Sequence, residues 1–300
     1  MRGFILCLIY AFINIGLMLF KKNTNSDNSE KAEMTFVEHL DVLRSHLFKS
    51  VVATTIGAVV VAVFNNFIVQ RILLGPTRAD FPTYRLLCQA SNYFNLGSRL
   101  CMKDIKLEMQ SNTVSGQFDV YLNVIVIGGF VLAFPYVFFQ FWKFIKPGLT
   151  KNELNNTRGV IFWVSTLFFI GVLFGYFVIS PYTINFFANF TLDEKIKNIW
   201  TINSYFNTVL PLTLGSGLAF QLPLVLYFLA KIGVVSATLL KNFRRYAYLT
   251  IIVVAGFITP PDMLSQIICS VPIIILYEVS ILLCKRVENE QKKEEIEEWS

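Results

Sequence analysis

The sequence predicts an all-α polytopic membrane protein with six transmembrane helices and both termini in the cytoplasm. Composition is the first reason: 54% of the 300 residues are hydrophobic and only 15% are charged, whereas soluble domains carry about 25% charged residues. The second reason is the distribution of charge, because the charged residues lie between long apolar runs and not within them. The mean hydropathy of +0.55 also indicates a membrane protein. Lipid is therefore the expected solvent for most of the chain.

Six apolar runs correspond to the predicted spans. Pro260 and Pro261 separate the last two and force a tight turn, because proline cannot continue a helix. We expect the last two helices to be short. The fifth, at about 1.5 Å per residue, would reach only about 21 Å, so the hairpin must thin the bilayer or tuck into other helices. The runs are 51–69, 121–141, 160–180, 208–230, 246–259 and 263–284.

Lysine and arginine set the predicted orientation, because cytoplasmic connections are enriched in these residues. The connection 142–158 has four basic residues against one acid, and 231–245 has four basic residues and no acid. The connection 184–205 is balanced. One connection disagrees: 70–118 carries six basic residues yet lies outside in this topology, where long connections follow the rule weakly. The protein is thus expected to cross a membrane several times, with both termini in the cytoplasm.

The two ends of the chain differ from this membrane domain, 34–286. Residues 1–33 form an apolar extension and a polar linker without a small-residue cleavage site. This segment is either a seventh span, a signal sequence or an artefact of an upstream start, with Met34 as the functional beginning; we favour an artefact or a dispensable extension. The tail 287–300 is charged and should be a solvated helix or disordered.

Cysteines, histidines and net charge exclude several other classes. Cys88 and Cys101 share the long 70–118 connection, so either they form a disulfide outside the cytoplasm or they are two unpaired thiols. His39 and His46 have no cysteine partners at metal-ligand spacing, so neither a metal nor another cofactor is expected. The net charge of +6 does not predict nucleic-acid binding, because the basic residues do not form one patch.

An amphipathic helix is predicted just before the first span. A Thr35–Glu38 capping box begins it, and four apolar residues then recur at helical spacing. We expect this helix to lie on the cytoplasmic membrane surface, either as a membrane-entry helix or as part of a binding site. The apolar residues are Phe36, Leu40, Leu43 and Leu47.

Three motifs resemble those of the TatC family, a subunit of the twin-arginine protein translocase. Residues 39–44 read HLDVLR, similar to the family's H-L-x-E-L-R. Residues 139–153 read FQFWKFIKPGLTKNE, and residues 259–266 read TPPDMLSQ; both resemble family motifs. Smaller matches occur at 75–76, 174–181 and 220–223, and all of them follow the family's order. The resemblance implies a receptor for signal peptides with two adjacent arginines, in a translocase that exports folded proteins across the bacterial inner (plasma) membrane.

Glu153 is the main binding residue that the resemblance implies. A guanidinium pair calls for carboxylates that accept bidentate hydrogen bonds, and Glu153 is the sole acid in a connection with four basic residues. It matches the family's binding glutamate, although Thr150 and Glu153 also form a capping box for the third span. Phe144 would pack beside the bound peptide or merely anchor the chain at the interface.

The first motif departs from the family pattern at Val42, where the family usually has glutamate. Asp41 is the best candidate for the second arginine contact, but it points about 100° away from Val42 on a helix, and its alternative is a solvated acid. Arg44 matches the motif, or is only a positive-inside residue. Leu43 completes the candidate peptide-binding set.

Polar residues in and next to the spans form a second candidate set. Gln221 lies where many family members carry glutamate, and would bond either a neighbouring helix or an inserted peptide. Glu278 lies near the cytoplasmic end of the sixth run. Its side chain would either extend to the membrane surface, cap the helix or take part in function. Pro76, Asp262 and Gln266 are expected to fix loop geometry outside the membrane, and a direct role of Pro76 and Asp262 in transport is the alternative.

The sequence contains no catalytic arrangement, so we expect no enzyme. It has no nucleophile triad, phosphate-binding loop or metal cluster. The resemblance implies instead the proton-motive force and single-span partners of the TatA type, with or without a TatB-type subunit, and self-association. A small-solute secondary transporter is the alternative function, and it predicts internal repeats, broken helices and charged midplane residues. A non-transporting scaffold is a third, and it predicts no need for Glu153.

Overall fold

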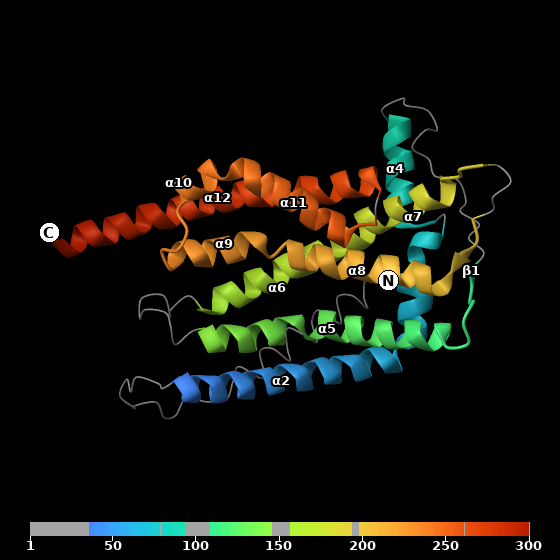
Figure 1. The fold of residues 1–300 in the computed structure, drawn as a ribbon, viewed down its shortest axis with the longest axis horizontal. Helices are drawn as coiled ribbons and strands as arrows, with labels where there is room; N and C mark the ends of the chain where they lie inside the picture. Colours follow the sequence, from blue (N-terminus) through green and yellow to red (C-terminus); the bar gives the residue numbers. More distant parts are fainter. Residues whose placement is uncertain are drawn as a thin grey trace.

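The computed structural model describes residues 36–78, 80–93, 109–145, 157–193, 198–260 and 262–299, with backbone alone at 36–40, 90–91, 157–158 and 290–299. Helices make up nearly all of this part and lie side by side in an elongated bundle (Figure 1). Five helical stretches are long and apolar enough to cross a membrane. They are Asp41–Val63, Gly116–Ile145, Gly159–Asn189, Ile202–Lys231 and Met263–Asn289.

Helix α2 (Phe36–Val63) joins the motif helix and the first span into one element. The prediction of a separate surface helix is therefore wrong. The reason is local, because residues 36–56 contain no glycine or proline and a helix propagates easily once it is formed. The span also ends earlier than expected, and the chain continues through α3 (Asn65–Phe67) and the π-helix η1 (Ile68–Leu73).

One end of the bundle is closed by short elements, and we call it the α4 end. Helix α4 (Pro82–Tyr93) stands across the direction of the spans (Figure 1). Strand β1 (Met109–Gln110) pairs in parallel with β2 (Trp200–Thr201). The 3-10 turn η2 (Gly75–Thr77) lies between η1 and α4.

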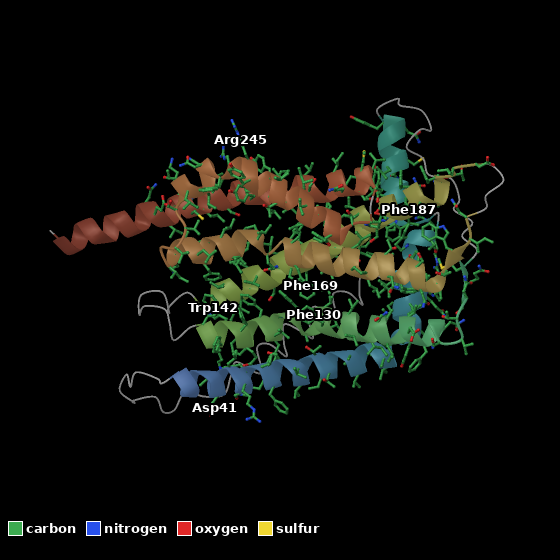
Figure 2. All side chains as sticks on the ribbon, viewed as in Figure 1. Asp41, Phe130, Trp142, Phe169, Phe187 and Arg245 are labelled. Carbon is green, nitrogen blue, oxygen red and sulfur yellow. The ribbon has the colours of Figure 1, made fainter. Side chains whose placement is uncertain are left out.

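The central helices follow the predicted second, third and fourth spans. Helix α5 (Gly116–Ile145) is continuous, whereas α6 (Thr157–Phe174), η6 (Gly175–Ile179) and α7 (Ser180–Asn189) follow one another in one span. Phe134 of α5 and Phe168 of α6 stack with ring centroids 3.5 Å apart. Figure 2 shows Phe130, Trp142 and Phe169 among the helices.

The fourth span is broken, a feature that the apolar run 208–230 does not predict. Helices α8 (Ile202–Ala219) and α9 (Leu222–Lys231) meet at Phe220 and Gln221. Pro223 contributes to the break, because proline has no backbone N–H to donate. The chain then reaches α10 (Ala237–Asn242) at the opposite end of the bundle, which we call the α10 end (Figure 1).

The last two helices differ in length. Helix α11 (Arg244–Ile258) has 15 residues, or about 22 Å, as expected for a short span. Helix α12 (Met263–Trp299) has 37 residues and is not short, which corrects that part of the prediction. It continues into the tail because residues 285–299 contain no glycine or proline and are rich in glutamate and lysine, which favour helix.

Candidate functional site

The α10 end brings together the helix ends that carry the candidate binding motifs. It contains the beginning of α2, the end of α5, the beginning of α6 and α10 (Figure 1). Glu153 lies between α5 and α6 but outside the described residues, so its role stays a prediction. His39 and Leu40 are described by backbone alone.

Helix α2 has two distinct faces at this end. Val42, His46 and Ser50 are half-buried and share the face on which Gly57 and Val61 are buried further along. Their spacing of three or four residues is that of a helix stripe packed against a neighbour. Val42, which stands where the family has glutamate, therefore belongs to the packed stripe.

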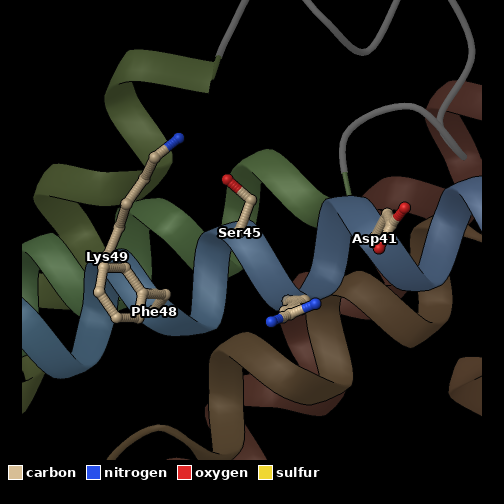
Figure 3. Close-up of a pocket in the computed structure, with 5 residues that line it drawn as sticks. Asp41, Ser45, Phe48 and Lys49 are labelled. Atoms are coloured by element: carbon tan, nitrogen blue, oxygen red, sulfur yellow. The ribbon is translucent and has the colours of Figure 1, made fainter.

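Asp41 and Arg44 lie outside that stripe and are exposed. A shallow depression on α2 is lined by Asp41, Arg44, Ser45, Phe48 and Lys49 (Figure 3). Asp41 forms no ion pair with any described side chain, and Figure 2 shows it on the outer side of the bundle. Its carboxylate is thus available to a cationic ligand. The packing does not bring Asp41 onto the face of Val42. Leu43 is also exposed, at 38%.

The end of α5 is held by polar and aromatic contacts. Gln140 is buried, and its Oε1 lies 2.7 Å from Nδ1 of His46 on α2. Trp142 is buried, with its ring centroid 4.5 Å from that of Phe228 on α9. Phe144, one turn beyond Gln140, is half-buried. The last turn of α5 is thus firmly seated next to the segment that carries Glu153.

Glu278 has partners that the sequence did not reveal. Arg244 Nη2 donates to Glu278 Oε2 at 2.6 Å, and the Tyr248 hydroxyl donates to Oε1. These contacts join α11 to α12. Spacing could not have predicted the ion pair, because its residues lie 34 positions apart.

A second acid of α12 holds α10. Glu288 Oε1 accepts a hydrogen bond from the backbone N–H of Ala237 at 2.6 Å, at the first residue of α10. A carboxylate at a helix N-terminus interacts favourably with its unpaired N–H groups. The beginning of the predicted tail, at Glu288, therefore contacts the α10 end.

Gln221 lies at the junction of α8 and α9. Its Nε2 donates to the backbone carbonyl of Val164 in α6 at 3.3 Å, which is the inter-helix bond that the sequence analysis considered. Its Oε1 is buried without a hydrogen-bond partner in the described part of the chain. A role in transport stays a prediction.

At the α4 end, the predicted structural residues make local contacts. Asp262 is only 3% exposed, and its Oδ2 accepts a hydrogen bond from the backbone N–H of Ser265 at 2.7 Å, which caps α12. Gln266 Nε2 donates to the carbonyl of Ile252 at 3.1 Å. A structural role for Asp262 and Gln266 requires local contacts of this kind.

Pro76 is fixed by α4. The Tyr84 hydroxyl donates to the Pro76 carbonyl at 2.7 Å, and burial raises the pKa of Tyr84, so this hydroxyl keeps its proton.

Cys88 of α4 belongs to a disulfide, but Cys101 lies outside the described residues and the pairing stays a prediction. The described residues contain no group of three or more His, Cys, Asp or Glu side chains that could hold a metal ion.

Comparisons with known proteins agree with the sequence resemblance. Residues 38–272 match the family described as Sec-independent protein translocase protein (TatC). The TatC protein of Blattabacterium sp. subsp. Periplaneta americana is 40% identical over 256 residues, or 85% of this chain and 96% of the relative. The TatCy protein of Bacillus subtilis is 35% identical over 188 residues, which cover 63% of this chain and 74% of the relative.

Two solved structures have the same fold. A crystal structure titled Twin Arginine Translocase Receptor-TatC in DDM superposes with a TM-score of 0.67 at 28% identity, covering 82% of this chain and 99% of that one. A second crystal structure of that receptor gives a TM-score of 0.63 at 27% identity, covering 84% of this chain and all of that one.

Proposed function

The chain belongs to the TatC family of Sec-independent protein translocase proteins, and we propose that it is the twin-arginine signal-peptide receptor and core subunit of a translocase for folded proteins. The observation that carries the proposal is the family match over residues 38–272. That range includes all three motifs, at 39–44, 139–153 and 259–266. The alternative of a small-solute transporter has no comparable support.

The recognition site is proposed at the α10 end. Two guanidinium groups need at least two negatively charged hydrogen-bond acceptors. Glu153 supplies the first, on the segment between α5 and α6. Asp41 supplies the second, and its exposure and lack of an ion partner among the described side chains support this role. Leu43 and Phe144 offer apolar surface to the peptide, and Arg44 orients its approach.

The α10 end is proposed to face the cytoplasm. Lys143, Lys231 and Lys241 lie in the last turns of α5, α9 and α10, and basic residues gather on the cytoplasmic side of bacterial membrane proteins. The termini of the membrane domain then lie in the cytoplasm, in the bacterial inner membrane. The short α11 thins the bilayer locally where cargo crosses, because about 22 Å is less than the hydrocarbon thickness.

Partners and energy follow from family membership as further parts of this proposal. Single-span subunits of the TatA type, with or without a TatB-type subunit, assemble with the receptor. The proton-motive force supplies the energy. Collapse of the membrane potential and pH gradient by an uncoupler should stop export of a twin-arginine reporter while leaving peptide binding intact.

The main experiment replaces the proposed acceptor. In cells that lack their own TatC, Glu153→Gln should reduce export of a folded twin-arginine reporter at least about tenfold, because one charge-assisted contact is lost. A reporter with two lysines should fail with the unchanged protein. The control is Asp119→Asn, an exposed acid at the α4 end. Normal export by the Glu153→Gln variant at a normal protein level would overturn the proposed site.

A crosslinking measurement tests the same site without transport. A photoreactive residue in place of Phe144 should capture a twin-arginine signal peptide, and the same residue in place of Phe118, exposed at the α4 end, should not. Equal capture at both positions would contradict the proposed location.

A further inference from the structure

Helix α2 is attached to the rest of the bundle almost entirely through α5. Only 6% of its span window is buried, compared with 22% to 39% for the other candidate spans. Within the described part of the chain, α5 is the one element against which α2 packs extensively. Whatever sets the position of α2 relative to α5 therefore sets the position of Asp41 and Arg44.

The middle of the α2–α5 contact is a close approach of two backbones. A Cβ atom added to Gly57 would lie 2.6 Å from the carbonyl oxygen of Gly129, and one added to Gly129 would lie 2.6 Å from the backbone nitrogen of Ala58. The helices touch there without room for a side chain. This contact fixes one point, but an apolar contact is non-directional. It leaves the first turns of α2 to be positioned by something else, because Asp41 lies sixteen residues before Gly57, about 24 Å away along the helix.

His46 and Gln140 supply that directional contact. His46 Nδ1 and Gln140 Oε1 are 2.7 Å apart, so an Nδ1–H of the ring donates to the amide oxygen. Among the described side chains of α2, His46 alone hydrogen-bonds to another helix. The hydroxyls of Ser50, Thr54 and Thr55 donate instead to carbonyls four residues earlier in α2.

The surroundings make this bond effective. Gln140 is 4% exposed, and a buried amide that loses its partner is costly. Val42, one turn before His46 on the same packed stripe, is apolar and offers no second polar contact. His46 lies about one and a half turns from Asp41, and Gln140 lies one turn from Phe144. The bond is thus placed between the two halves of the proposed peptide site.

We propose that the His46–Gln140 hydrogen bond positions the receptor site by holding the Asp41 face of α2 at a fixed distance from the end of α5. It thereby sets the distance between Asp41 and Phe144, which are both proposed to contact the signal peptide. His46 and Gln140 are positioning residues and do not themselves contact the peptide. This inference rests on the proposed function.

A mutant cycle on the full chain in membranes tests the proposal. His46→Leu and Gln140→Leu should each weaken binding of a twin-arginine signal peptide about fivefold, roughly the effect of one hydrogen bond. The double variant should be no weaker than either single one, because the same contact is lost in all three. The exchanged pair, His46→Gln with Gln140→His, should restore binding to within about twofold.

Further variants separate positioning from simple destabilisation. Thr54→Val removes a side-chain hydrogen bond that stays within α2, and should leave binding unchanged. His46→Gln alone keeps a donor toward Gln140 and should bind better than His46→Leu. All variants are compared at equal protein level, and the melting temperature of each is measured. If a leucine variant fails to fold, its binding is judged from the His46→Gln variant instead.

The outcomes distinguish this inference from the function on which it rests. Additive losses in the double variant, or no recovery in the exchanged pair, would overturn the positioning role while the unchanged protein still binds. Failure of the unchanged protein to bind any twin-arginine peptide would overturn the proposed function, and this inference with it.

Discussion

The two ends of the bundle are built differently. The α4 end is held by buried hydrogen bonds: Tyr205 donates to the carbonyl of Leu73 at 2.7 Å, and the hydroxyls of Thr183 and Ser265 lie 2.6 Å apart. The α10 end has the exposed acid Asp41, which forms no ion pair with any described side chain, whereas the exposed acids Asp80 and Asp119 of the α4 end are bonded to Arg85 and Ser115. A receptor needs accessible charge where its ligand arrives and rigidity elsewhere. The difference therefore separates a structural end from the proposed recognition end.

The largest expected effect comes from the close approach of α2 and α5, which lies midway between the two ends. Gly57→Leu places a side chain against the backbone of α5, where even a Cβ lies 2.6 Å from an oxygen. We expect a loss of more than about 3 kcal/mol or failure to accumulate. Protein level and melting temperature in detergent measure it. Gly159→Leu, at a glycine whose added Cβ meets nothing within 4 Å, is the control. A stable Gly57→Leu variant would contradict the close packing.

Tyr205→Phe tests the rigidity of the α4 end. It leaves the buried carbonyl of Leu73 without this donor, at a cost of about 1–3 kcal/mol. Melting temperature should fall, and the peptide affinity of the folded fraction should not change. Tyr246→Phe, at a tyrosine that is 68% exposed, should have little effect. A large drop in peptide affinity without a drop in stability would break the division between the two ends.

Asp262→Ala tests the cap of α12. Loss of the hydrogen bond to the Ser265 N–H should cost about 1–2 kcal/mol, seen as a lower melting temperature. Asp262→Asn retains an acceptor oxygen and should lose less. Equal losses in the two variants would show that the charge matters more than the cap.

Asp41→Asn tests the recognition end. Stability should change by less than about 0.5 kcal/mol, because the residue is exposed. Affinity for a twin-arginine peptide should fall about three- to fivefold, and this difference should shrink at high salt. Unchanged affinity would remove Asp41 from the site.

The smallest effect is expected for Arg244→Gln. The side chains of Arg244 and Glu278 are 43% and 35% exposed, so their ion pair contributes about 0–1 kcal/mol. Tyr248 also remains as a partner of Glu278. Melting temperature in low salt measures it, and a loss above about 2 kcal/mol would show that the pair is more critical than its exposure indicates.

Much of the fold could be predicted because lipid imposes strong local rules. Apolar runs predicted the spans, and the pair Pro260 and Pro261 predicted the turn before α12. The continuity of α2 and the length of α12 were missed, because amphipathic and charged patterns do not by themselves end a helix. The break at Gln221 was also missed, because the sequence signal there is only one proline.

For the candidate site, the sequence indicates residue types but not contacts. Asp41 and Val42 were expected on different faces from helical spacing, and the packing of α2 agrees. The partners of Glu278, Glu288 and His46 were not predictable, since they come from helices far apart in the chain.

The sequence by itself determined that this chain spans a membrane, which apolar runs form its spans and which family motifs it carries. These properties depend on local composition and order, because each span must be apolar and must satisfy its own backbone. Only the tertiary structure decided which face of α2 meets α5, and hence that His46 bonds Gln140 across 94 positions. The reason is that helix packing depends on the shapes of two surfaces together, and neither surface alone specifies the other.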